Sequence, residues 1–127
     1  MERKFIPFPV AGAIKSPLSA GVEVNGTVYL SGVTAINYET GQVPDADIGE
    51  QTHLVFKSIK AVLVSIGLGL EHVVRVHVFL TSQGDVGVMN EIYREYFKEP
   101  YPARSTVIAA ALARPGFKIE IDITAVR

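Results

Sequence analysis

The sequence predicts a single α+β domain, a β-sheet with two helices packed on one of its faces. Three observations support this prediction: an Asn25-Gly26 pair between two β-rich runs, an apolar stripe at helical spacing after Asp47, and strict apolar-polar alternation over residues 118–126. The 127 residues suit one domain, and no repeat or low-complexity linker divides them. We therefore expect one domain over residues 1–127.

Residues 22–30 predict a β-hairpin, because Asn and Gly both tolerate the positive φ angles that a tight hairpin turn requires. A second turn is expected at residues 39–41.

Two helices are expected. Asp47, with Glu50 three residues later, forms the pattern of a capping box and predicts the start of the first helix. Gly67 predicts its end, because glycine readily takes the left-handed conformation that terminates a helix. The apolar stripe of this first helix is Val55, Ile59, Val62 and Ile66. The second helix is expected over residues 85–97, and its apolar stripe is Met89, Ile92, Tyr93 and Tyr96.

Three further strands are expected at Val73–Leu80, at residues 106–112 and at residues 118–126. If the isoleucines of the last strand face the helices, Glu120 and Asp122 lie on the uncovered face. The matching set in the middle strand is Val73, Arg75, His77 and Phe79. Such a face is too apolar to be fully exposed to solvent and too charged to be part of an ordinary core. The simplest explanation is that another subunit packs against it.

Composition excludes several classes of function. There are no cysteines, which excludes disulfides and thiolate metal sites, and the net charge of -1 provides no basic field for a nucleic acid. The N-terminus lacks the pattern of a signal or transit peptide, and the apolar runs are too short to span a bilayer. We expect a cytoplasmic protein with no membrane or nucleic-acid partner.

Two side chains are the strongest candidates for chemistry. Arg104, expected immediately before a strand, is either a surface arginine or an anion clamp, since a guanidinium matches a carboxylate with paired donors. Glu120 stands in the middle of an apolar alternating strand, where a carboxylate usually has a partner or a role. The three histidines, His53, His72 and His77, lack metal-ligand spacing, so no metal site is expected.

Four motifs together closely resemble the RidA/YjgF/UK114 family. They are Leu30-Ser31-Gly32, Asn90 within residues 89–93, the Pro-Ala-Arg-Ser-Thr-Val run at residues 102–107, and the Lys-Ile-Glu-Ile run at residues 118–121. The resemblance covers nearly the whole chain. It implies a homotrimer of chorismate-mutase-like subunits (bacillary type), each a mixed sheet with two helices on one face, with clefts between neighbours.

The resemblance also implies an activity. Arginine-bearing members hydrolyse reactive enamine and imine acids, such as 2-aminoacrylate, to 2-keto acids and ammonia without a cofactor. Arg104 would hold the substrate carboxylate, and Glu120 would orient or deprotonate the attacking water. Ser31, Gly32 and the main chain near Thr106 would line the pocket, and Asn90 would support the cleft.

Three positions depart from the family pattern. Leu18 stands where many deaminating members have tyrosine, Val33 replaces a common glutamine, and Thr106 replaces a common cysteine. Leu18 and Val33 would make the substrate-binding pocket more apolar. Two alternatives stay open: a non-catalytic ligand-binding or chaperone-like trimer, and an RNA-directed activity, against which the balanced charge argues. The Arg104–Glu120 pair separates catalyst from binder, because a binder needs the clamp but not the base.

Overall fold

Six strands form one mixed sheet in the order β1-β2-β3-β6-β4-β5. The computed structural model describes residues 2–10, 12 and 14–127. All neighbouring strands are antiparallel except β4 and β5, which run parallel. The strands are β1 (Arg3–Ile6), β2 (Gly21–Val24), β3 (Thr27–Leu30), β4 (Val73–Leu80), β5 (Ala103–Ile108) and β6 (Ile119–Val126).

The hairpin between β2 and β3 is confirmed. Asn25 and Gly26 take φ angles of 51° and 80°, so both central residues of the turn are left-handed. This geometry matches the right-handed twist of the flanking strands and fixes their register. The hairpin joins the rest of the sheet where Val28 of β3 lies opposite Ala125 of β6.

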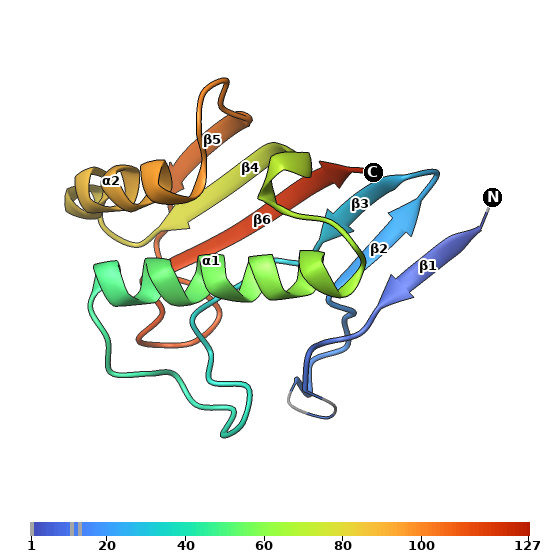
Figure 1. The fold of residues 1–127 in the computed structure, drawn as a ribbon. Coiled ribbons are helices and arrows are strands. Elements are labelled where there is room, and N and C mark those ends of the chain that lie inside the picture. Colours follow the sequence, from blue (N-terminus) through green and yellow to red (C-terminus); the bar gives the residue numbers. More distant parts are fainter. Residues whose placement is uncertain (1, 11, 13) are drawn as a thin grey trace.

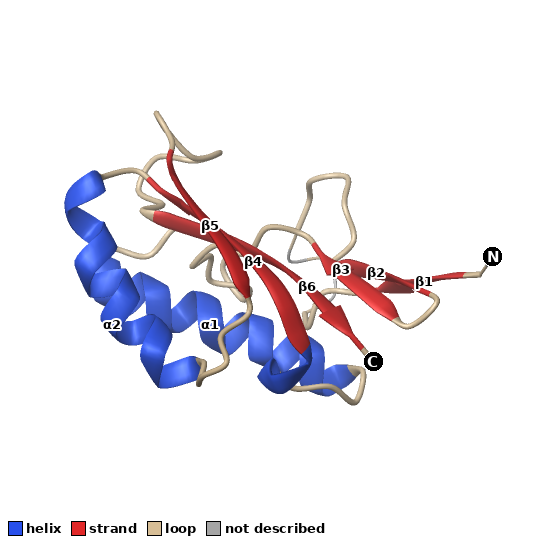
Figure 2. Cartoon of the chain, turned by 90° about the horizontal axis from the view of Figure 1, so that it is seen from above, coloured by secondary structure: helices blue, strands red, loops and turns tan. Residues whose placement is uncertain are grey.

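Two helices, α1 (Ile48–Ser65) and α2 (Val86–Tyr96), cover one face of the sheet and leave the other without a helix (Figures 1 and 2). The Asp47 carboxylate accepts the Glu50 N–H at 2.8 Å and so caps α1, while Gly67 ends the helix at φ 78°. Short 3-10 turns precede β4 (Leu70–His72) and α2 (Gln83–Asp85). The two predicted helices and their common face are confirmed.

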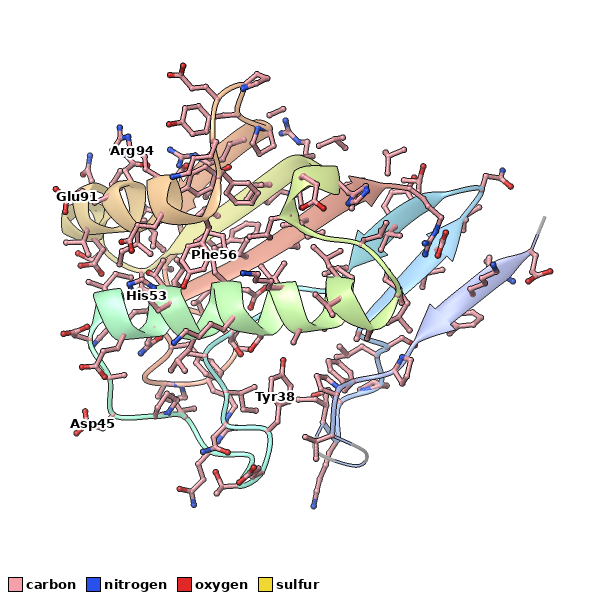
Figure 3. The ribbon with its side chains drawn as sticks, viewed as in Figure 1. Tyr38, Asp45, His53, Phe56, Glu91 and Arg94 are labelled. Carbon is pink, nitrogen blue, oxygen red and sulfur yellow. The ribbon has the colours of Figure 1, made fainter. Side chains whose placement is uncertain are left out.

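The core lies between the helices and the inner face of the sheet. Phe56 of α1 is fully buried there (Figure 3). Its ring stacks on Tyr96 of α2 with ring centroids 4.6 Å apart. The three isoleucines of β6, Ile119, Ile121 and Ile123, lie on the same inner face and are buried. The alternation predicted for β6 is therefore confirmed, with Glu120 and Asp122 on the face that carries no helix, called here the open face.

The prediction for β4 was wrong at its first residue. Val73 is buried and Val74 is exposed, because the pairing with β6 shifts register between Val73 and Arg75. This bulge turns Val73 toward the helices, whereas Arg75, His77 and Phe79 stay on the open face as expected.

The prediction for β5 was displaced along the chain. The strand covers Ala103–Ile108 rather than residues 106–112, so Arg104 lies within the strand and not before it. Pairing stops at Ile108 because its partner β4 ends at Leu80, whose carbonyl accepts one last bond from Ala109 N–H at 2.7 Å. Strand β1 was not predicted. Within the described residues, no helix is both long and apolar enough to cross a membrane.

Candidate active site

The predicted site residues form two groups, and strand register places them on opposite sides of the sheet. Glu120 lies opposite Phe79 on the open face, whereas Arg104 lies opposite Val76, which is buried beneath the helices. Residues directly opposite one another in neighbouring strands point to the same side. One subunit therefore separates Arg104 from Glu120.

The first group surrounds Glu120 in a pocket of about 420 Å³, whose lining includes Leu18, Ser31 and Gly32. Ser31 is anchored by its hydroxyl, which donates to the Ser19 carbonyl at 2.7 Å. Gly32 lies directly against the Glu120 carboxylate, and a Cβ atom at position 32 would overlap it. Glycine thus allows the backbone and the carboxylate to approach closely here.

The environment of Glu120 favours its protonated form. Partial burial raises the pKa of Glu120 above its ordinary value, and the nearby Asp122 carboxylate raises it further. A paired cation would lower the pKa again, but Glu120 takes part in none of the ion pairs of the described residues. A carboxylate in such surroundings is a stronger proton acceptor once ionised than an exposed one.

The second group surrounds Arg104 in a pocket of about 220 Å³ that Asn90 of α2 also lines. The Arg104 guanidinium lies 4.7 Å from the centre of the Tyr93 ring and 3.8 Å from Met89 Sδ. No carboxylate pairs with Arg104 among the residues that the structure places. Thr106 lies on the same side of β5 two residues later, opposite Val78. The arrangement positions a cation on an aromatic ring with its donors available to an anion.

Val33 joins neither group. Its N–H and C=O exchange hydrogen bonds with Ile121 at 2.7 and 3.0 Å, and its side chain is buried in the core. This short pairing with β6 directs the side chain inward. Val33 therefore supports the strand behind the Glu120 pocket and does not line it.

The three histidines serve structural contacts. His53 is hydrogen-bonded to Tyr96 Oη at 2.8 Å, and His72 accepts the Gly69 N–H at 3.1 Å. On the open face His77 Nδ1 donates to Asp122 at 2.8 Å and Nε2 accepts from Arg75 Nε at 3.0 Å. No group of three or more possible ligands gathers to hold a metal in the described part of the chain.

Sequence reasoning assigned Tyr93 only to the core and left Arg94 and Arg114 out of the site. Arg94 and Tyr93 line the Arg104 pocket, and Arg114 lines the Glu120 pocket. Tyr93 follows Asn90 by three residues, a spacing that puts both on one side of α2. The helical spacing in the sequence therefore indicates that Tyr93 lies beside Asn90 at the pocket. Arg114 lies in the loop before β6, and no pattern in the sequence indicates that it lines the Glu120 pocket together with Leu18.

Comparisons with known proteins agree with this fold and these motifs. The family model described as endoribonuclease L-PSP matches residues 10–127. Protein DfrA of Myxococcus xanthus is 40% identical over 99% of this chain and 97% of its own. The 2-iminobutanoate/2-iminopropanoate deaminase of Dermatophagoides farinae is 33% identical over 94% of this chain and 93% of its own.

Solved structures give the same result. YyfA from Yersinia pestis, described as a protein of the conserved Rid family, superposes with a TM-score of 0.91 at 35% identity, covering 99% of this chain and 100% of YyfA. Escherichia coli TdcF, solved with bound serine, superposes with a TM-score of 0.80 at 33% identity, covering 95% of this chain and 92% of TdcF. The predicted family and fold class are confirmed. The chain belongs to the endoribonuclease L-PSP family, which includes the Rid/YjgF proteins.

Proposed function

We propose that this protein hydrolyses reactive 2-imino and enamine acids of the 2-aminoacrylate type to 2-keto acids and ammonia, at clefts between the subunits of a homotrimer. The observation that carries the proposal is the half-buried Glu120 carboxylate held against Gly32, with a pKa raised by burial and by Asp122. Support also comes from the relative in Dermatophagoides farinae, which is named an imine deaminase, and from TdcF, which holds a serine.

The separation of Arg104 from Glu120 favours a shared site. A 2-imino acid carries its carboxylate on the carbon next to the imine, so clamp and base must approach one small molecule together. Because one subunit holds the two groups on opposite sides of its sheet, the cleft takes Arg104 with Asn90 from one subunit and Glu120 with Gly32 from its neighbour.

The open face provides a surface for association. Phe5 and Tyr29 are 64% and 53% exposed, and strand register places both on this face with Val107, which lies opposite Phe79. The exposure of two large aromatic side chains to water is unfavourable. They share this face with the half-buried hydrogen-bonded network of Arg75, His77 and Asp122, so the face is better suited to a protein contact than to solvent. A second copy of the chain is the occupant that we propose.

The chemistry requires few groups. Water adds to the carbon of the protonated imine, the tautomer through which an enamine also reacts, while Glu120 accepts one proton of the water, which gives a neutral carbinolamine. That proton then passes from Glu120 to the nitrogen and the C–N bond breaks as ammonia leaves, while Glu120 takes the hydroxyl proton and the C=O bond forms. Arg104 holds the substrate carboxylate throughout. A positioned water, a general base and a charge clamp account for the reaction.

The test pairs turnover with binding in wild type and Glu120→Gln. The substitution keeps size and most hydrogen bonding but removes the proton acceptor, so imine hydrolysis should fall roughly a hundredfold. Affinity for 2-ketobutanoate, measured by calorimetry, should change much less because Arg104 remains. Equal hydrolysis rates would remove Glu120 from the mechanism. Wild type that binds the keto acid without hydrolysing imines would favour a non-catalytic binder.

Shared clefts are tested by mixing two inactive variants. Arg104→Ala and Glu120→Gln subunits, unfolded together and refolded at equal ratio, should regain about a quarter of the wild-type activity, because that share of clefts pairs an intact Arg104 with a neighbour's intact Glu120. Sedimentation should give three times 13.8 kDa for each protein. A stable monomer, or no regain of activity in mixed assemblies, would overturn the shared site.

A further inference from the structure

The pocket that holds Arg104 contains a second arginine for which the proposed reaction has no role. Arg94 of α2 lines the same cavity of about 220 Å³, together with Asn90 and Tyr101. Its side chain is exposed and projects from the rim of the helix (Figure 3). Two arginine residues therefore line one small cavity.

Within one subunit no acidic residue of the described lining balances these two charges, and in the proposed cleft only the neighbour's Glu120 approaches them. Asn90 and Tyr101 are neutral, and none of the residues described as lining the cavity is Asp or Glu. Neither arginine forms an ion pair within the described residues, although Glu91 lies one turn before Arg94 on α2. Like charges close together repel, so the arrangement is most favourable when anionic groups enter the cavity.

A cavity lined by two arginines and by no acidic residue of its own subunit fits a ligand with two negative charges. We infer that the protein prefers 2-imino acids with a second carboxylate on the side chain: Arg104 holds the carboxylate beside the imine, and Arg94 holds the distal one. This inference rests on the proposed function and names its substrate class.

Keto acids test this preference without turnover. Calorimetry compares 2-ketoglutarate with 2-ketobutanoate, which lacks the second carboxylate, on wild type, Arg94→Gln and Lys57→Gln. A charge-assisted contact from an exposed arginine gives wild type roughly tenfold tighter binding of 2-ketoglutarate. Arg94→Gln should abolish that difference and leave the affinity for 2-ketobutanoate unchanged. Lys57, exposed on α1, controls for the loss of one positive charge.

Two outcomes would overturn the inference. One is wild type that binds both keto acids equally. The other is Arg94→Gln that weakens both to the same extent, which would show that Arg94 serves the carboxylate beside the imine. Hydrolysis of 2-aminoacrylate is measured on the same samples. If the protein hydrolyses 2-aminoacrylate but shows no Arg94-dependent preference for 2-ketoglutarate, only the inference about the second carboxylate is wrong. If it shows that preference but no hydrolysis, the proposed reaction is wrong and the selectivity of the pocket is retained.

Discussion

Gly32→Ala tests the position of Glu120 without altering either proposed catalytic side chain. Gly32 does not have a positive φ, so its backbone conformation is open to alanine. The added methyl group would meet the Glu120 side chain, with Cδ at 2.8 Å and Cγ at 3.1 Å from the new Cβ. Glu120 is a flexible side chain and moves more easily than the strand beside it.

The size of this movement follows from ordinary contact distances. Non-bonded carbon atoms pack at about 3.5–4.0 Å, so the carboxyl carbon must move by roughly 1 Å. A misplacement of about 1 Å in a catalytic group costs on the order of a hundredfold in rate. We expect kcat/KM for imine hydrolysis to fall by about that factor, while the free energy of unfolding changes by less than about 1 kcal/mol.

The assay measures keto-acid release from 2-aminoacrylate above the spontaneous rate, and urea denaturation monitors the fold. Gly87→Ala is the matched control, since a Cβ there meets nothing within 4 Å. Gly87 lies in α2, where alanine should raise helix stability by up to about 1 kcal/mol and leave hydrolysis unchanged. A folded Gly32→Ala protein with wild-type kcat/KM would refute the argument that the Glu120 carboxylate acts from its place beside Gly32.

Four further outcomes are expected. Arg104→Lys keeps the charge but loses the planar fork, so kcat/KM should fall roughly ten- to a hundredfold, and an unchanged value would exclude the clamp. Hydrolysis should decline as pH falls through the pKa of Glu120, which burial and then Asp122 raise above its ordinary value, because the base must be ionised. Asp122→Asn should move that acid limb of the kcat/KM profile to lower pH, and no movement would contradict the coupling. Tyr93 Oη is buried without a hydrogen-bond partner among the described groups, so Tyr93→Phe should cost less than about 0.5 kcal/mol in urea denaturation; a loss above about 1 kcal/mol would reveal a missed partner.

Sequence patterns predicted the elements whose signals are local. The Asn25-Gly26 turn, the Asp47 cap and the alternation of β6 each depend on residues close together in the chain, and the structure confirms all three. The same alternation correctly placed Glu120 on the open face. The pairing of Glu120 with Gly32, distant in sequence, came only from the family resemblance and the close approach in the structure.

The failures depend on contacts with other strands. Val73 and Val74 are chemically identical, so no pattern can show that the bulge turns Val73 inward and Val74 outward. Residues 109–112 are apolar enough for a strand, yet β4 ends at Leu80 and leaves them without a partner. Strand β1 has four residues, three of them exposed, and is too short for its alternation to be informative.

The two halves of the proposed site carry opposite charges, and each half lacks the opposite charge that the other half provides. The Glu120 carboxylate is partly desolvated beside a second carboxylate, and the Arg104 guanidinium lies in a cavity with another cation and no acid. A two-fold dimer would have to bury both patches in one continuous interface, but they lie on opposite sides of the sheet. In a closed ring each subunit presents one patch to each neighbour, so all clefts can be complete at once. This geometry favours a ring over a dimer, and the proposed activity would then depend on assembly even though Arg104 and Glu120 lie in the same chain.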